Sequence, residues 1–361
     1  MSAIENIRTR VDRIDREIVH LLQSRYEHAK LLGEIKRAKG LSLRDQGRER
    51  QVLRRVQGMA RELGLPARDV KEIFGHIFEL SLRVQNPLPS RSTSDLDEMR
   101  VLVAGGTGGM GLFFAQLARS HGAHVSIFGR SRDRTRKMAS DFGFEPGSIR
   151  DSQDSDWVIV AVPIDATVDM CLRLGKHLGR ESILTDISSV KSGISDKIAR
   201  LPHSGWEYVS LHPLFGPQLS HIYGQDIIQV PYRARDQWSL LAEFYESEGA
   251  HLHQTSAETH DRVMAYLQGL HHFGLTCIGL SLRNWDGQYS TNSLQRTVGT
   301  IQGIVESWHT VADIQKYNPY CHQARREFRL LVSRLSQTGI PYQLTTARSL
   351  EANVQKWSRK Q

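Results

Sequence analysis

An apolar stripe runs through the first 35 residues in alternating steps of three and four positions. Its positions are Ile4, Ile7, Val11, Ile14, Ile18, Leu21, Arg25, His28, Leu32 and Ile35. This spacing predicts one long helix that packs along a bundle and ends near Gly40. Burying an unpaired guanidinium is costly. Arg25 therefore either meets an anion inside the bundle or is solvated on a stripe that drifts by ~20° per heptad.

Two more helices and a linker complete the first module. The second helix carries Val52, Leu53, Val56, Met59 and Leu63, and Gly64 with Pro66 closes it. The third helix starts after Pro66 and carries Val70, Ile73, Phe74, Ile77 and Ser81. Proline and serine are concentrated in residues 86–95. We therefore predict an all-α domain over 1–86 and a linker over 87–98.

Composition limits the function classes. The 361 residues suffice for two or three domains, and no apolar run approaches the ~20 residues of a membrane-spanning helix. The N-terminus lacks the apolar block of a signal peptide. Cys171, Cys277 and Cys321 are scattered without metal-ligand spacing, which favours a cytoplasmic protein with reduced thiols and no metal site.

Charge is concentrated near the N-terminus. Residues 1–85 hold 18 basic and 12 acidic side chains, a surplus of +6 within a total of +8. A basic helical module can bind nucleic acid. Here acidic residues interrupt the basic ones and no aromatic platform accompanies them, so a small anionic ligand is the preferred interpretation.

A glycine-rich turn defines the second domain, which we predict over 99–254. The apolar strand 101–104 leads into Gly106, Thr107, Gly108, Gly109, Met110 and Gly111, and an apolar helix follows from Leu112. Such glycines permit a tight turn and close approach of a pyrophosphate. Further strands are predicted over 123–128, 157–163 and 182–188. We therefore predict a doubly wound α/β domain of the Rossmann type that binds a dinucleotide.

The second strand ends at Arg130, Ser131 and Arg132. An NAD site usually has an acidic residue there for the ribose 2′-hydroxyl, whereas arginine accommodates a 2′-phosphate. These residues favour NADP, with NAD as the alternative if both arginines are solvated.

The third domain, over 255–361, is predicted to be all-α. Thr255 and Glu258 form a possible capping box at its start. Val263, Leu267, Leu270 and Gly274 predict a packed helix, and further helices are expected within 291–308 and 320–337.

The first 85 residues resemble the all-helical chorismate mutases. Eight residues match the positions that line the active site of that family: Arg8, Arg25, Lys36, Asp45, Arg48, Glu49, Ser81 and Gln85. The resemblance implies Arg25 and Arg48 on the carboxylates of chorismate, Lys36 and Gln85 on its ether oxygen, and Glu49 on its hydroxyl. It also implies a homodimer in which Arg8 reaches into the partner's site.

Residues 99–361 resemble prephenate dehydrogenase. The segments that carry the resemblance are 186–191 (DISSVK), 211–217 (LHPLFGP) and 268–273 (QGLHHF). The resemblance implies that His212 is the base for the C4 hydroxyl of prephenate and that Ser189 lies near that hydroxyl. His272 orders cofactor or substrate, unless the adjacent His271 has that role.

One position departs from the dehydrogenase pattern. The family usually has an arginine before an Asp-Ile-Gln element to bind a substrate carboxylate, and that position here is Gln302. Arg296 is a substitute, with Arg325 and Arg326 as further candidates. Prephenate and its amino analogue arogenate both stay open as substrates.

Two other function classes were weighed against a bifunctional enzyme of tyrosine biosynthesis. In one, the dinucleotide-binding part is a regulatory or ligand-sensing module behind an active mutase. In the other, the basic module binds nucleic acid. Retained Ser189 and His212 argue against the sensor, and the interleaved acids argue against nucleic acid. We expect small-molecule substrates, no nucleic acid and no membrane.

Overall fold

The computed structural model describes residues 3–39, 46–85, 96–203, 205–219, 221–338 and 351–353. The chain divides into two compact units, Met1–Ser94 and Asp95–Gln361. Each unit is described separately. No helix among the described residues is both long and apolar enough to cross a bilayer.

The first unit consists of three helices in its described part, as predicted. They are α1 (Ala3–Ala38), α2 (Gln46–Glu62) and α3 (Ala67–Gln85). Helix α3 packs against both α1 and α2. Gly64, with φ of 70°, reverses the chain after α2 in a conformation that other residues rarely adopt. The apolar contacts centre on Ala29, Val56, Ala60 and Phe78, which are buried.

The apolar stripe of α1 is largely exposed within one copy of the bundle. Around Ala29 and Gly33 the helix is buried against its neighbours. Ile7, Ile14 and Leu21 instead have 62%, 54% and 70% of their surface exposed. The long helix was predicted correctly, and Leu32 and Ile35 near its C-terminal end are also exposed, by 46% and 53%, so one copy of the bundle leaves much of the stripe uncovered.

The second unit is built on an eight-stranded sheet in the order β3-β2-β1-β4-β5-β6-β7-β8. The strands are β1 (Arg100–Ala104), β2 (His124–Phe128), β3 (Glu145–Pro146), β4 (Trp157–Val160), β5 (Ile183–Asp186), β6 (Glu207–Pro213), β7 (Asp226–Arg233) and β8 (His251–Gln254). The first six strands in chain order run parallel, whereas β7 is antiparallel to β6. Reversal of the strand order on either side of β1 creates the crevice where α/β folds bind ligands.

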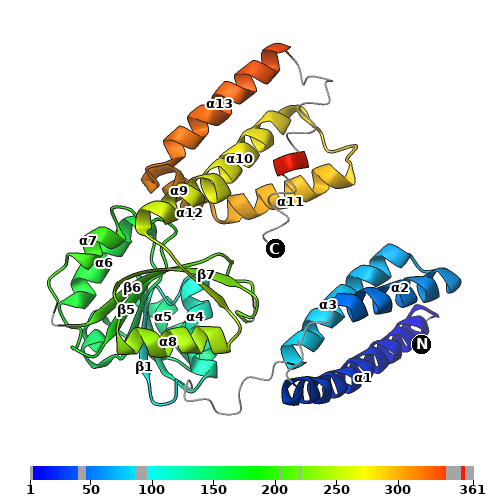
Figure 1. Cartoon of the computed structure of the whole chain (residues 1–361), viewed down its shortest axis with the longest axis horizontal. Helices are drawn as coiled ribbons and strands as arrows, with labels where there is room; N and C mark the ends of the chain where they lie inside the picture. The colour runs from blue at the N-terminus through cyan, green and yellow to red at the C-terminus, as the bar shows by residue number, and fades with distance from the viewer. Residues whose placement is uncertain are drawn as a thin grey trace. The chain divides into compact units, whose positions relative to one another are not determined.

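Helices cover both faces of this sheet (Figure 1). On one face lie α4 (Gly109–Ser120), α5 (Arg132–Phe142) and α8 (Asp236–Ser247), packed on Val101, Val103 and Ile159. On the other face lie α6 (Ile164–Gly175) and α7 (Ser195–Ala199), packed on Leu102, Val158 and Leu184. Consecutive strand residues point to opposite faces, which explains why these strands are apolar throughout.

The remaining helices form the C-terminal part of the same unit. They are α9 (Ala257–Met264), the π-helix η2 (Ala265–Leu270), α10 (His271–Ser281), α11 (Asn292–Glu306), α12 (Trp308–Tyr317) and α13 (Cys321–Thr338). Cys321 packs closely on Gly269. A β-carbon added at Gly269 would lie 2.4 Å from the sulfur of Cys321. Ile314, Cys321 and Ala324 join the core beneath β4 and β5, which fixes the helices to the sheet.

Two local expectations for this region were wrong. Ser256, and not Thr255, caps α9, because its hydroxyl accepts the backbone N–H of Thr259. Val263 and Leu267 are exposed, whereas Met264, Ala265 and Gly269 are buried. The π-turn shifts the helical period by one residue, so a 3.6-residue pattern predicts the wrong buried face.

Candidate active sites

Arg25 joins α1 to α3 through polar contacts. Its guanidinium donates hydrogen bonds to the hydroxyl of Ser81 and, over 3.4 Å, to the carbonyl of Ile77. It also lies 5.6 Å from the centre of the Phe78 ring, within cation–π range. Burial lowers the pKa of Arg25. No acidic residue among the described residues is hydrogen-bonded or ion-paired to this guanidinium, so its positive charge is available to an anionic ligand.

The other predicted mutase residues are described to different extents. Lys36 is half-buried on α1, whereas Arg8 and Arg48 are exposed. Arg48 donates a 2.5 Å hydrogen bond to Gln51 one turn later. Glu49 and Gln85 belong to α2 and α3, but their side chains lie outside the described residues, as does all of Asp45. Arg25 and Ser81 are thus the predicted pair that the described structure brings together.

The glycine-rich turn connects β1 to α4. A β-carbon at Gly106 would lie 2.6 Å from Ile127, and one at Gly111 would lie 2.3 Å from the carbonyl oxygen of Gly105. Gly108 is the N-cap of α4, and no side chain caps it. The N–H groups of the first turn therefore point to an uncovered space, as pyrophosphate binding requires. These residues fit a dinucleotide.

Basic side chains flank the same turn at the end of β2. Arg130 and Arg132 are exposed, as expected for a 2′-phosphate site. Ser131 caps α5 by accepting the backbone N–H of Arg134 over 3.3 Å. The guanidinium of Arg134 donates a 3.0 Å hydrogen bond to the carbonyl of Thr107, which adds a third cation beside the turn. The sequence analysis did not single out Arg134.

His212 lies at the end of β6 and is almost fully buried. Its Nδ1 lies 2.8 Å from Nε2 of His260, and Nδ1 of His260 lies 2.7 Å from Oδ1 of Asp261. Its Nε2 lies 3.3 Å from the amide nitrogen of Gln268. Burial, and then the neighbouring His260 and Lys191, hold the pKa of His212 well below 6.5. A neutral imidazole at neutral pH is the form that a general base requires.

Asp261 anchors this chain of side chains. Its carboxylate accepts backbone N–H bonds from Lys191 over 2.9 Å and from Ser192 over 2.7 Å. Its backbone carbonyl accepts the Asn318 amide. Asp261 and His260 therefore tie α9 to the loop after β5. Neither residue was identified from the sequence, and their adjacency in a helix gave no signal of a site.

A buried ion pair supports the same loop. The ammonium of Lys191 lies 3.6 Å from Asp186 and donates to the hydroxyl of Ser210 over 2.7 Å and the carbonyl of Leu211 over 2.6 Å. The phenol of Tyr208 donates to the other oxygen of Asp186. Burial alone would raise the pKa of Asp186, but Lys191 and the donors of Ser188 and Ser210 lower it overall. Lys191 thus holds the strand directly before His212.

Two buried polar atoms on the helical segment that contacts His212 have no partner among the described residues. They are Oε1 of Gln268 and Nδ1 of His272, both buried. Burial, and then His271, lower the pKa of His272. His271 is exposed, so of the two histidines it is His272 that offers a buried nitrogen to a ligand. Ser189 is half-buried on the loop between Asp186 and Lys191.

The predicted carboxylate-binding residues are not in this cluster. Gln302 is exposed on α11 and donates to Glu306 over 3.3 Å. Arg296 is exposed on the same helix. Arg325 donates to the side chain of Gln315, whose amide binds the carbonyl of Gly269 beside Gln268. Arg325 is therefore the candidate arginine connected to the π-helix that carries Gln268.

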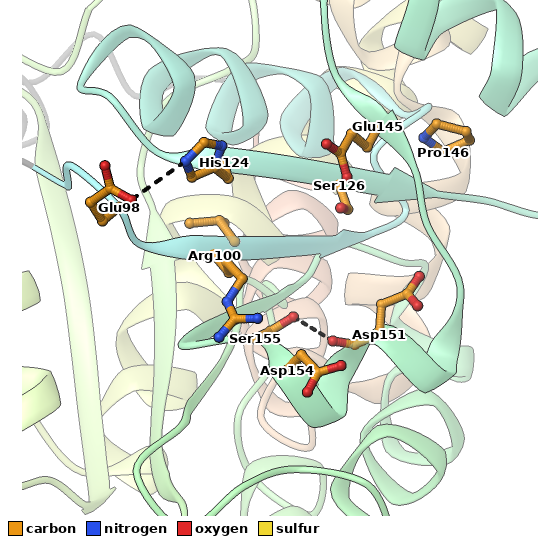
Figure 2. Close-up of a pocket in the computed structure, with 10 residues that line it drawn as sticks. Glu98, Arg100, His124, Ser126, Glu145, Pro146, Asp151, Asp154 and Ser155 are labelled. Atoms are coloured by element: carbon orange, nitrogen blue, oxygen red, sulfur yellow. Dashed lines mark hydrogen bonds and ion pairs between the residues drawn. The ribbon is translucent and has the colours of Figure 1, made fainter.

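A cavity of about 670 Å³ lies at the amino ends of β1 and β2, away from the glycine-rich turn at the carboxyl end of β1 (Figure 2). Its lining includes Glu98, Arg100, His124, Glu145 and Asp151. Arg100 and His124 begin β1 and β2, whereas ligands of α/β sheets bind beyond the carboxyl ends. The acidic lining would also repel phosphates. We therefore assign no catalytic role to this cavity. The described residues contain no cluster of His, Cys, Asp and Glu suited to a metal ion.

Comparison with known families agrees with this division into two sites. Residues 7–86 match the model of chorismate mutase type II, and residues 114–252 match the nucleotide-binding domain of prephenate dehydrogenase. The chain thus joins a domain of the chorismate mutase type II family to a nucleotide-binding domain of the prephenate dehydrogenase family. The bundle α1–α3 is the mutase domain, and the sheet with its C-terminal helices is the dehydrogenase domain, whose matched part is a nucleotide-binding domain.

Two named proteins are similar to much of this chain. The T-protein of Haemophilus influenzae is 28% identical over 284 residues, which cover 78% of this chain and 71% of that protein. A probable arogenate/prephenate dehydrogenase of Methanocaldococcus jannaschii is 26% identical over 64% of this chain and 54% of its own length.

Solved structures share the fold of the dehydrogenase domain. Prephenate dehydrogenase of Aquifex aeolicus, in complex with hydroxyphenyl propionate and NAD⁺, has a TM-score of 0.55 and 19% identity over 75% of this chain and 96% of its own. Arogenate dehydrogenase of Synechocystis has a TM-score of 0.57 and 19% identity over 72% of this chain and 100% of its own. At this identity the likeness shows the fold alone.

Proposed function

We propose that this chain catalyses two consecutive reactions of tyrosine biosynthesis. The mutase domain rearranges chorismate to prephenate, and the dehydrogenase domain converts prephenate, with NADP⁺ or NAD⁺, to 4-hydroxyphenylpyruvate, CO₂ and the reduced cofactor. The observation that carries the second assignment is the buried, neutral His212 at the end of β6, beside Gln268, whose Oε1 has no partner among the described residues.

The mutase reaction is unimolecular and needs neither a nucleophile nor a metal. The site must hold chorismate in a compact conformation and stabilise charge that develops on its ether oxygen. Arg25, held by Ser81 and Phe78, would bind one carboxylate. Arg48 would bind the other, Lys36 and Gln85 the ether oxygen, and Glu49 the hydroxyl, with Asp45 at the same site.

In the dehydrogenase reaction, Nε2 of His212 takes the proton of the C4 hydroxyl as hydride leaves C4. A nicotinamide dinucleotide held at the glycine-rich turn would supply the acceptor for that hydride. Loss of CO₂ then makes the ring aromatic, which supplies the driving force. Ser189 would bind the same hydroxyl, and the free Oε1 of Gln268 and Nδ1 of His272 would orient the substrate or the cofactor.

We propose that NADP is the preferred cofactor. Between the end of β2 and Arg132 the chain has no acidic residue for a ribose 2′-hydroxyl. Arg130, Arg132 and Arg134 place three cations near the turn, and a 2′-phosphate would use them. Comparison of kcat/KM for NADP⁺ and NAD⁺, in the wild type and in Arg130→Ala, tests this preference. Equal loss with both cofactors would contradict it.

The substrate of the second step depends on the carboxylate contact. Prephenate and arogenate have the same two carboxylates and differ by the ammonium that arogenate has in place of the keto oxygen, and a charged arginine binds a carboxylate more strongly than an amide does. Gln302 is uncharged and bonded to Glu306, so Arg325 and Arg296 are the proposed charged partners for prephenate. Replacement of either by alanine should raise the KM for prephenate.

We propose that the mutase domain functions as a homodimer. The exposed N-terminal half of the α1 stripe is apolar, and a second copy of α1 would cover it. Arg8 belongs to this half, which agrees with a contribution from the partner. Such a dimer gives Arg8 a role even though it lies far along α1 from Arg25.

The decisive assay supplies chorismate with NADP⁺ or NAD⁺ and follows chorismate loss and reduced nicotinamide together. Prephenate and arogenate are then supplied in its place. We expect chorismate loss to be followed by nicotinamide reduction. We also expect reduction when prephenate is supplied in place of chorismate. Chorismate loss without reduction from any of the three substrates would refute the dehydrogenase assignment and favour the ligand-sensing alternative.

A further inference from the structure

The side chains behind His212 form a continuous chain that ends in a carboxylate. The chain runs from His212 to His260 over 2.8 Å and from His260 to Asp261 over 2.7 Å. Asp261 and His260 are fully buried at their side chains. Asp261 can accept but not donate in its ionised form, and two backbone N–H groups already bind its oxygens.

This arrangement determines where each proton lies. Since Asp261 accepts, Nδ1 of His260 carries a proton and Nε2 of a neutral His260 has the lone pair. That lone pair can only accept, so Nδ1 of His212 donates to it. The remaining nitrogen of His212, Nε2, then has a lone pair, and the amide N–H of Gln268 donates to it over 3.3 Å. Each hydrogen bond in the chain agrees with one tautomer.

We propose that His260 and Asp261 are positioning residues of the dehydrogenase reaction, which hold His212 in the tautomer whose Nε2 accepts the substrate proton. The proposal rests on His212 being the base, as proposed above. When Nε2 of His212 takes the proton of the C4 hydroxyl, its Nδ1–H stays bonded to His260. The positive charge on His212 then faces a neutral imidazole whose own N–H is bonded to the carboxylate of Asp261.

The same contacts make the base depend on how the helices meet the sheet. His260 and Asp261 belong to α9, whereas His212 ends β6 and Lys191 follows β5. The charged and titratable groups that face His212 and His260 are Lys191, Asp186 and Asp261. The tautomer is therefore correct only where α9 is packed against the loop that also carries Ser189.

Two substitutions at His260 separate positioning from packing. In His260→Gln, the amide reaches the position of Nε2 and can still accept from His212. In His260→Asn, the shorter amide reaches only the position of Nδ1 and keeps the contact with Asp261. His253→Asn is the matched control, since His253 is an exposed histidine paired with Asp226 on β7. Tryptophan fluorescence of each full-length variant reports that the dehydrogenase domain has folded, because all six tryptophans lie after residue 156.

We expect His260→Asn to lower the kcat of prephenate oxidation by about 10-fold to 100-fold, with the KM for prephenate within about twofold. His260→Gln should retain at least about fivefold more activity than His260→Asn, and His253→Asn should match the wild type. Equal losses in the Gln and Asn variants, a wild-type kcat in His260→Asn, or an effect on KM alone would overturn the proposal. Wild-type activity in His212→Asn would instead refute the base assignment itself.

Discussion

The ammonium of Lys191 lies 3.6 Å from Oδ1 of Asp186, and neither side chain has any exposed surface. The pair connects the loop after β5 to β6, because Lys191 also binds Ser210 and the carbonyl of Leu211 directly before His212. Burial lowers the pKa of Lys191, and Asp186 and then Asp261 oppose that shift. The position of the proposed base thus depends on a charge pair that no water reaches.

Removal of one partner should be costly. Lys191→Met leaves the carboxylate of Asp186 buried without its cation, so the free energy of unfolding of the dehydrogenase domain should fall by about 3–5 kcal/mol. Tryptophan fluorescence during urea unfolding measures this domain alone, because all six tryptophans lie after residue 156. Lys197→Met, at an exposed lysine on α7, is the control and should change stability by less than about 0.5 kcal/mol. Equal effects of the two would contradict the buried pair.

The turn before α4 should respond to a single methyl group. Gly108 has φ of −88°, so alanine fits its backbone, and a β-carbon there would meet only the carbonyl of Gly105 at 3.3 Å. Gly108→Ala should leave stability within about 1 kcal/mol but weaken dinucleotide binding at least about tenfold, because the methyl group occupies the space next to the uncapped N–H groups. Titration calorimetry measures the affinity. Gly303→Ala, with open space at its β-carbon, should bind as the wild type does.

Stability of the dehydrogenase domain should decrease in weak acid. Burial is the first cause that lowers the pKa of His212, His260 and His272 below the ordinary 6.5. Below pH 6.5 the unfolded chain therefore binds protons that the folded chain does not. As the pH is lowered, the free energy of unfolding decreases by up to about 1.4 kcal/mol per pH unit for each histidine. Urea unfolding between about pH 7.5 and pH 5.5 measures the slope. His212→Asn should flatten it, whereas an unchanged slope would show that His212 does not titrate differently on unfolding.

The exposed stripe of α1 should control assembly. Ile14→Glu introduces a charge into the stripe, whereas Val19→Glu places the same charge about 140° away from Ile14 around the helix, at a residue that is also exposed. Light scattering coupled to size exclusion should show loss of the mutase-domain contact in Ile14→Glu, with lower mutase activity, and no change in Val19→Glu. Identical behaviour of the two variants would contradict a dimer formed through this stripe.

Local patterns predicted the fold well. The stripe of α1, the glycine-rich turn and the apolar strands each have a periodicity that one stretch of chain reveals. His212 was identified because its motif at 211–217 is continuous in the sequence. His260 and Asp261 were not, since 48 residues separate His260 from His212 and only the packing of α9 on the β5 loop brings them together. Gln302 is a second example of this limit. Its place in a family motif suggested a role in the substrate site, but its side chain is exposed on α11 and bonded to Glu306.

Sequence periodicity also failed where the backbone is irregular. The π-turn at Ala265–Leu270 inserts one residue into the helical repeat, and it rotates Gln268 toward His212 while Leu267 faces outward. In a regular helix through the same residues, Gln268 and Leu267 would not have the environments that they have here. The part of the site that could not be predicted therefore lies where regular secondary structure is interrupted.

The central claim is that one chain carries two independent active sites, and a reciprocal pair of variants tests it most directly. Arg25→Ala should lower chorismate loss by at least about a hundredfold while reduced nicotinamide still forms from supplied prephenate at the wild-type rate. His212→Asn should preserve chorismate loss and lower prephenate-dependent reduction by about 10²-fold to 10⁴-fold. Arg16→Ala, an exposed arginine off the stripe, should match the wild type in both assays. Loss of both activities in either folded variant, or of neither, would contradict the account.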